Sequence, residues 1–516
     1  MSTSVALDED LSNARLNDAT GASRHATPSA DNIDIGNMPK SVPIETELKR
    51  ARVQPPSTPA GPTTIRVWIG RGLALALVIG TILYLWRAYE ATGLFISIGM
   101  DYGLYLAQAT VMGGDDPTKI YDKSVTNIAY RHLLDLYAHD PHYDPAIPGI
   151  WASHVPYPPI FAWAMQPLTW ITPSTSVLVW ACANSLLALW IGWRVAQHCP
   201  GSDKPTVMLL FLGSYPVVLN LHVGQIQILL AWVVTECYLA LRAGRDFRAG
   251  VWLGCLLVKP HYGLLLGLLL LWKSRWKTVL GVTVTGSVIL GGSLLAGGLQ
   301  PLLAYPQAFS DMVQFRGDSP IVMLNWRSIV LDWYPSIYWR SGIILTICLG
   351  IATALCVGWV WRGPWNPSAD DFPAKMLLTL LATIMILYHS HPYGAAILVM
   401  PLAAVVLSGQ ASRVAQGIAC AGAIIPTLIF TYGHQEPLSD WELNLHLEFA
   451  SQLLKAATVA LCAHTFIQLI RSTHANAVGT ETEEDNFRAL EGPSSQHDSL
   501  PHRGTTPQHQ RPASNG

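Results

Sequence analysis

Long apolar runs separated by short polar breaks occupy most of this chain between residues 65 and 472. The runs are about 15–25 residues long, and a helix that crosses a bilayer needs about 20 apolar residues. Half of all residues are hydrophobic and only 13% are charged, whereas an average soluble domain has about 25% charged residues. We therefore predict an all-α, polytopic membrane protein with about 10–13 hydrophobic helices.

The charge and motif content excludes several classes of function. The net charge is −2 and the sequence has no basic stripe, so we expect no nucleic-acid partner. The eight cysteines lie in or beside apolar runs without a CxxC pair, which favours buried small side chains over metal ligands or disulfides. Walker A and GxGxxG motifs are absent, so we expect no nucleotide cofactor. We predict no metal site, because HxxxH and HExxH are absent, while a divalent metal ion stays an open alternative.

Two polar tails flank the membrane domain, which we place at residues 65–472. Residues 1–64 and 473–516 lack apolar periodicity, so we expect both to be disordered. Basic residues between Lys49 and Arg71 surround the start of the first apolar run, and positive charge stays on the cytoplasmic side of a membrane. This predicts cytoplasmic tails and an exit of the first helix at Arg87–Gly93. The tails carry no eukaryotic sorting signal, so we expect a location in an inner or plasma membrane.

The segment after the first helix is expected to form a long extracytoplasmic loop. It extends for roughly 70 residues to Tyr157. Residues 130–137 place their apolar side chains on one helical face, which predicts a helix lying on the membrane. The next apolar stretch, Pro158–Ile171, is roughly 14 residues long, so a full crossing and a half-helix both stay open.

Charge parity predicts that four separate stretches meet on the outer side of the membrane. The basic clusters Arg242–Arg248 and Lys273–Lys277 should both be cytoplasmic, so the apolar run between them must go in and come back. Lys259-Pro260 is the natural turning point of that run. The converging stretches are Asp101, Tyr157–Pro159, Gly224–Gln227 and Lys259. We interpret this convergence as the candidate site.

The polar side chains of these stretches each have a functional and an ordinary interpretation. Asp101 is a candidate general base, or an ordinary acid that faces water at a helix end. Lys259 lies within an apolar run, which favours a phosphate partner over snorkelling to the interface. Gln225 and Gln227 are candidates for recognition of sugar hydroxyls, or for helix capping and a bond between helices.

Further cationic candidates are expected on the same side, although each alone is typical of an ordinary loop residue. They are Arg316, Arg327, His389 and His391. The two histidines are spaced i, i+2, which does not place both rings on one helical face and does not predict a zinc site.

The order of short motifs along the chain resembles glycosyltransferase family 87, a family of integral-membrane enzymes of the GT-C type. The residues that carry the resemblance are Met100–Tyr105, Ile120-Tyr121, Tyr157–Ile160, Pro167-Leu168, Gly224–Gln227, Ala249-Gly250, Lys259-Pro260 and Trp272–Lys277. Better-known members are actinobacterial α-mannosyltransferases that depend on polyprenol-phosphate mannose. One departure is Gly394 after His389–Tyr393, where family members often have a later acidic residue.

The resemblance implies transfer of a hexosyl unit, such as mannosyl, from a polyprenyl-phosphate donor to a lipid or glycan acceptor. Asp101 would take the proton of the acceptor hydroxyl, and inversion at the anomeric carbon would follow. Cations would stabilise the phosphate leaving group, namely Lys259, Arg316 and Arg327. The side chains expected to bind sugar or acceptor are Tyr102, Tyr157, Gln225, Gln227, His389 and His391.

Two other functions compete with this interpretation. A polytopic transporter or lipid flippase would also suit the broken run at Lys259-Pro260, but transporters usually contain internal repeats, and none is visible in the sequence. A GT-C ligase that moves a whole glycan differs only in its donor and acceptor. Topology tags at Asp101 and Gly224 that report opposite sides would contradict a shared site.

Overall fold

The computed structural model describes residues 64–137, 156–199, 203–314, 322–333, 341–407, 411–432 and 448–472. All of them lie in one compact unit, Gly61–Gly516. The described residues form helices and connecting turns, without a β-strand. The all-α class is therefore confirmed, whereas the two predicted tails lie outside the described residues apart from Thr64, where the first helix begins.

Six described helices are long and apolar enough to cross a membrane. They are α2 (Thr64–Ile98, with the apolar part Val67–Glu90), α6 (Pro173–His198), α12 (Trp276–Gly297), α15 (Ile343–Val360), α18 (Arg413–Tyr432) and the helix Glu448–Ser472. A seventh span is formed if α7 (Lys204–Leu212) and α8 (Tyr215–Val223), which bend by 48°, count as one. These helices confirm the polytopic class. Among the described residues, the predicted number of 10–13 hydrophobic helices is reached only by counting apolar helices that are too short to span alone.

The apolar run around Lys259 is broken where the sequence predicted. Helix α10 (Asp246–Cys255) passes into the 3-10 helices η3 (Leu256–Val258) and η4 (Pro260–Gly263), and α11 (Leu264–Trp272) continues the run. Proline lacks the N–H that a continuous helix needs at this point. The run therefore consists of two half-length helices with Lys259 at their junction.

The region between α2 and α6 is mostly helical. Helix α2 continues past the predicted exit at Arg87–Gly93 and ends at Ile98, and Gly99 separates it from the next helix. The short α5 has only seven residues and is about 10 Å long, too short to cross by itself. The remaining elements here are α3 (Met100–Met112), η1 (Pro117–Lys119), α4 (Lys123–Tyr137), α5 (Pro159–Met165) and η2 (Gln166–Thr169).

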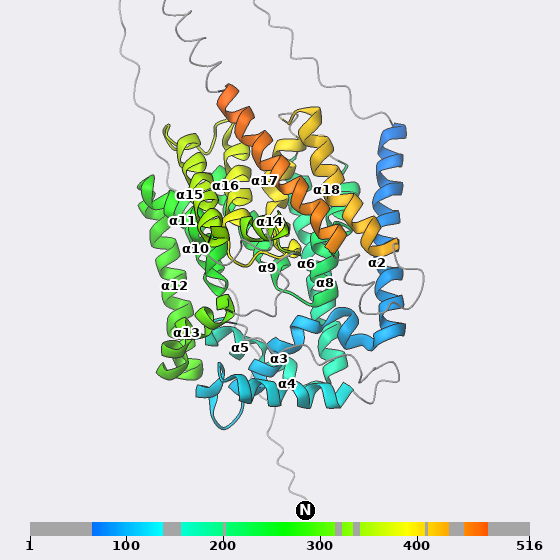
Figure 1. Ribbon diagram of the computed structural model, residues 1–516, viewed down its shortest axis with the longest axis vertical. Helices are drawn as coiled ribbons and strands as arrows, with labels where there is room; N and C mark the ends of the chain where they lie inside the picture. The colour runs from blue at the N-terminus through cyan, green and yellow to red at the C-terminus, as the bar shows by residue number, and fades with distance from the viewer. Residues whose placement is uncertain are drawn as a thin grey trace, which may run out of the picture. The chain divides into compact units, whose positions relative to one another are not determined.

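The helix predicted at residues 130–137 is the second half of α4. Helix α3 packs against both α4 and α5, and α5 packs against α12 (Figure 1). Helices α13 (Leu299–Gln314) and α14 (Trp326–Trp333) lie between α12 and α15, and α14 carries the predicted cation Arg327.

Helix α9 (Gln227–Arg242) lies at the centre of the core. Most of its residues are buried, and it packs against α6, α10 and the 3-10 helix η7 (Pro392–Leu398). Its one buried carboxylate, Glu236, accepts two bonds from the Arg194 guanidinium at 2.7 and 3.0 Å. Helices α16 (Phe372–Ile386) and α17 (Val399–Leu407) both pack against η7. This packing holds the start of α9, where Gln227 lies, rigidly in place.

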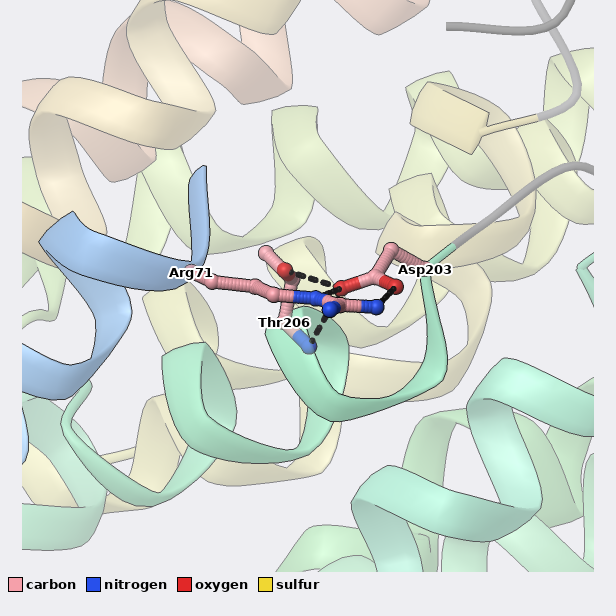
Figure 2. Close-up of polar contacts among 3 residues, drawn as sticks. All are labelled: Arg71, Asp203 and Thr206. Atoms are coloured by element: carbon pink, nitrogen blue, oxygen red, sulfur yellow. Dashed lines mark hydrogen bonds and ion pairs between the residues drawn. The ribbon is translucent and has the colours of Figure 1, made fainter. Parts of the chain in front are cut away.

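An ion pair connects the first span to α7 (Figure 2). Asp203 accepts hydrogen bonds from the backbone N–H and hydroxyl of Thr206, so it caps the N-terminus of α7. The same carboxylate binds the Arg71 guanidinium of α2 through two bonds, at 2.6 and 3.0 Å. Together these partners hold the pKa of Asp203 well below its usual range, with the Arg71 bond as the largest cause.

Candidate active site

Asp101 lies in the first turn of α3 and is partly buried. The N-terminal end of a helix favours a carboxylate, because the unpaired backbone N–H groups point toward it. One carboxylate oxygen accepts a hydrogen bond from the Gln225 side-chain amide at 2.6 Å. The Gln225 carbonyl oxygen accepts a second bond, also 2.6 Å, from the Tyr105 hydroxyl one turn further along α3. Gln225 therefore closes a chain of polar groups between two side chains of α3.

A left-handed glycine places Gln225 against α3. Gly224 ends α8 with φ +73°, a conformation that other residues rarely adopt. A Cβ atom at this position would lie 2.7 Å from the Tyr102 Cβ. The Gly224 carbonyl accepts a 2.8 Å bond from the Trp180 indole, and the Gln225 backbone N–H donates to the Asn220 carbonyl at 3.0 Å. The turn between α8 and α9 is thus held from both sides.

Tyr157 continues the polar chain from α3 to the start of α5. Its hydroxyl lies 3.4 Å from the Tyr105 hydroxyl, and its backbone carbonyl accepts a 2.5 Å bond from Tyr121. Burial is the largest cause that raises the pKa values of Tyr105 and Tyr157 well above the usual value. Both hydroxyls therefore stay protonated at neutral pH and keep a hydrogen for donation.

Lys259 lies inside a cage of three tyrosine rings. Its ammonium is 5.7 Å from the ring centroids of Tyr157, Tyr262 and Tyr393, and the residue is only 8% exposed. Aromatic faces attract a cation through their quadrupoles, and this attraction is strongest away from water. The junction between η3 and η4 thus holds a buried positive charge next to the chain that leads to Asp101.

Gln227 extends the site toward η4. Its side-chain N–H donates to the Tyr262 hydroxyl at 3.2 Å, and its backbone N–H donates to the Asn220 side-chain carbonyl at 2.9 Å. The residue is fully buried, and its side-chain oxygen has no hydrogen-bond partner among the described residues. The bond to Tyr262 is the contact between helices that the sequence offered as one alternative, and a role of Gln227 in binding sugar stays a prediction.

The segment with His389 and His391 reaches the same cage. The two imidazole rings are 4.5 Å apart, and the His391 ring is 5.2 Å from Tyr393, which contacts Lys259. The segment is held by the 2.7 Å bond from the Leu324 N–H to the Ser390 carbonyl. These contacts place both histidines beside the site.

Two predicted site residues lie outside the polar chain and the tyrosine cage, and a third lies outside the described residues. Tyr102 is fully buried, its hydroxyl bonds to Ser176, and its ring stacks on Trp180 at 5.3 Å, which indicates packing rather than substrate contact. The Arg327 guanidinium lies 4.1 Å from the Tyr388 ring, beside the histidine segment rather than in the tyrosine cage. Arg316 lies outside the described residues.

Several residues of the site were not singled out from the sequence. Tyr105 lies one helical turn after Asp101, and this i, i+4 spacing was the available signal. Tyr262 and Tyr393 carry aromatic rings around Lys259, and only the fold brings Tyr393 there. Within the described residues, no group of three His, Cys, Asp or Glu side chains could hold a metal ion.

Two apolar cavities are lined partly by the 3-10 helices that carry residues of the site. The first, of about 280 Å³, includes Ala395, Ala396 and Leu398 of η7 in its lining. The second, of about 260 Å³, includes Pro260 and Gly263 of η4. Almost all of the lining side chains are apolar, so these spaces suit hydrocarbon rather than water.

The profile of glycosyltransferase family 87 matches residues 155–390 of the chain. The matched region includes Tyr157, Gln225, Gln227, Lys259 and His389, whereas Asp101 precedes it. A search among curated proteins and a search among solved structures each found no match. The match confirms the resemblance stated from the short motifs.

Proposed function

We propose that this chain, a membrane glycosyltransferase that matches family 87 over residues 155–390, transfers a hexosyl unit from a polyprenyl-phosphate donor to a lipid or glycan acceptor. The observation that carries this proposal is the continuous polar path from Asp101 through Gln225, Tyr105 and Tyr157 to Lys259. Sugar transfer needs a base for the proton of the acceptor hydroxyl and positive charge near the leaving phosphate. The path has a carboxylate at one end and a buried cation at the other.

In the proposed reaction, Asp101 takes the proton of the acceptor hydroxyl as its oxygen attacks the anomeric carbon. The bond between that carbon and the phosphate oxygen breaks, and the electron pair leaves with the polyprenyl phosphate. Lys259 stabilises the negative charge that develops on the phosphate, and its buried position strengthens the effect. A single displacement of this kind inverts the configuration at the anomeric carbon.

The apolar cavities support a lipid-linked substrate. Each one is lined partly by a 3-10 helix that also carries a side chain of the tyrosine cage, Tyr393 on η7 and Tyr262 on η4. A hydrocarbon chain in either cavity would therefore lie close to a head group at Lys259. We place the site on the outer face of the cell membrane, with both termini cytoplasmic, on the basis of the basic clusters.

The family match favours a transferase over a transporter or flippase. The broken run at Lys259 suits a transporter as well, but a base held by Gln225 at a helix start has an immediate use in glycosyl transfer. A ligase that moves a whole glycan would use the same base with a larger donor.

The test is sugar transfer from polyprenyl-phosphate sugars by the purified protein and by Asp101→Asn. This variant keeps the size of the side chain and removes the base, so we expect transfer to fall by about 100-fold or more while donor binding is retained. Asp135→Asn, on the exposed side of α4, is the matched control and should behave as wild type.

Two results would contradict the proposal. An Asp101→Asn variant as active as wild type would remove Asp101 from the reaction. A wild-type protein that consumes no polyprenyl-phosphate sugar would exclude this class of donor and return attention to transport.

A further inference from the structure

His261 on η4 is a partly buried histidine whose two ring nitrogens are buried and have no hydrogen-bond partner among the described residues. The ring lies between two aromatic side chains, 4.8 Å from Tyr262 and 6.2 Å from Phe309 of α13. An imidazole always carries at least one N–H donor. Burial of that donor without an acceptor costs free energy, so such groups usually meet a ligand or an ordered water.

The Lys259 ammonium supplies positive charge near His261. Lys259 and His389 lie within electrostatic range of the ring. The Tyr262 ring contacts both the Lys259 ammonium and the His261 ring. A group that enters this space to accept the imidazole hydrogen would therefore also meet positive charge, which selects an anion.

Other buried polar atoms without described partners lie close to this position. The Tyr305 hydroxyl is one of them, and Tyr305 precedes Phe309 by one turn on the same face of α13. The Gln227 side-chain oxygen is another, on the residue that bonds to Tyr262. Unsatisfied groups on residues of η4, α9 and α13 indicate a site built for a polar ligand rather than a single packing defect.

We propose that His261 donates a hydrogen bond to a phosphate oxygen of the lipid-linked donor, next to the Lys259 ammonium. This inference rests on the proposed function and adds a ligand contact to it. The hydrogen bond to a charged oxygen positions the phosphate while Lys259 balances its charge. His261 then contributes to donor binding in the ground state as well as to departure of the phosphate.

The experiment measures binding of polyprenyl phosphate without its sugar to the purified full-length protein and to His261→Phe. The sugar-free lipid isolates the phosphate contact from sugar recognition and from catalysis. We expect the dissociation constant to rise about tenfold or more, as for the loss of a hydrogen bond to a charged group. His261→Gln, whose amide can donate from a similar position, should recover part of this loss.

Thermal stability without ligand provides a second readout. If the ring is unsatisfied until the donor binds, His261→Phe should melt at or above the wild-type temperature, because an apolar ring removes an unsatisfied donor. The control is His198→Phe at the exposed end of α6, where the ring bonds to the Arg194 carbonyl. It should leave binding unchanged.

Equal binding of sugar-free polyprenyl phosphate by wild type and His261→Phe overturns the inference. A lower melting temperature of His261→Phe also overturns it, because the ring would then already bond to an ordered water without the donor. If His261→Phe does not fold, His261→Ala is measured in the same way and decides by the same criteria. Failure of wild type to bind any polyprenyl phosphate overturns both this inference and the proposed donor class. Equal binding by wild type and variant overturns this inference alone.

Discussion

The Gln225 side-chain amide donates to the Asp101 carboxylate at 2.6 Å while its carbonyl accepts from Tyr105 at 2.6 Å. An ionised carboxylate can only accept hydrogen bonds, so the amide nitrogen faces Asp101 and the carbonyl oxygen faces the Tyr105 hydroxyl, which donates. Gln225 thus orients the proposed base.

Replacing Gln225 by Met should lower the rate constant of sugar transfer by about 10-fold, with donor binding little changed. Methionine has a similar length but cannot donate to a carboxylate, so Asp101 loses its orientation and one bond to its charged form. Steady-state kinetics with separate kcat and KM values checks this. The matched control is Gln307→Met, because Gln307 donates to Asp311 at 2.7 Å in an exposed pair on α13. Equal kinetics for the two variants would contradict a positioning role.

Replacing Lys259 by Met should lower kcat/KM for the lipid donor by about 100-fold or more, because the buried charge that faces the phosphate is lost. Lys259→Arg should not restore activity, since a planar guanidinium differs in shape from the ammonium that the three tyrosine rings surround.

Lys375→Met is the control for Lys259. Lys375 also lies 5.7 Å from an aromatic ring, that of Trp361, but pairs with Asp371 away from the tyrosine cage. An Arg variant at position 259 with full activity would show that charge alone is needed there.

Replacing Gly224 by Ala should reduce both stability and activity. The left-handed backbone costs about 1 kcal/mol for alanine, and the new Cβ would lie 2.7 Å from Tyr102. The turn must then shift, and Gln225 shifts with it. Thermal unfolding in detergent and the transfer assay measure the two effects.

Gly244→Ala separates backbone strain from the clash with α3. Gly244 also has a left-handed backbone, φ +66°, but no atom lies within 4 Å of a Cβ at that position. This variant should lose stability modestly and retain activity. Similar losses of activity at both glycines would show that contact with α3 is unimportant.

The pair of Arg71 and Asp203 predicts a pH dependence of stability. The pKa of Asp203 is lower in the folded protein than in the unfolded chain, so its contribution is present above pH about 4 and is lost as the pH falls further. Asp203→Asn should therefore melt lower than wild type at neutral pH, and the difference should shrink at pH about 3.

The control for this titration is Asp370→Asn, at an exposed position, which should melt as wild type throughout. Arg71→Met removes the largest cause of the shift and should flatten the pH profile as Asp203→Asn does. A wild-type melting temperature that falls with acid no faster than that of Asp203→Asn would count against the ion pair.

The sequence by itself determined the helical membrane class, the break at Lys259-Pro260 and the stretches that meet at the site. These features depend on properties that are local along the chain. Apolar length sets whether a helix can span a bilayer, proline interrupts a helix, and positive charge prefers one side of the membrane. The short motifs also pointed to the family that matches residues 155–390.

Only the tertiary structure decided which side chains of these stretches touch. Tyr102 and Tyr105 both follow Asp101, yet Tyr102 bonds to Ser176 in the packed interior and Tyr105 bonds to Gln225. The direction of a helical side chain depends on how the helix is rotated against its neighbours, and distant segments set that rotation. The same reason explains why His261, beside a lysine that the sequence did single out, became a candidate ligand contact only in the folded chain.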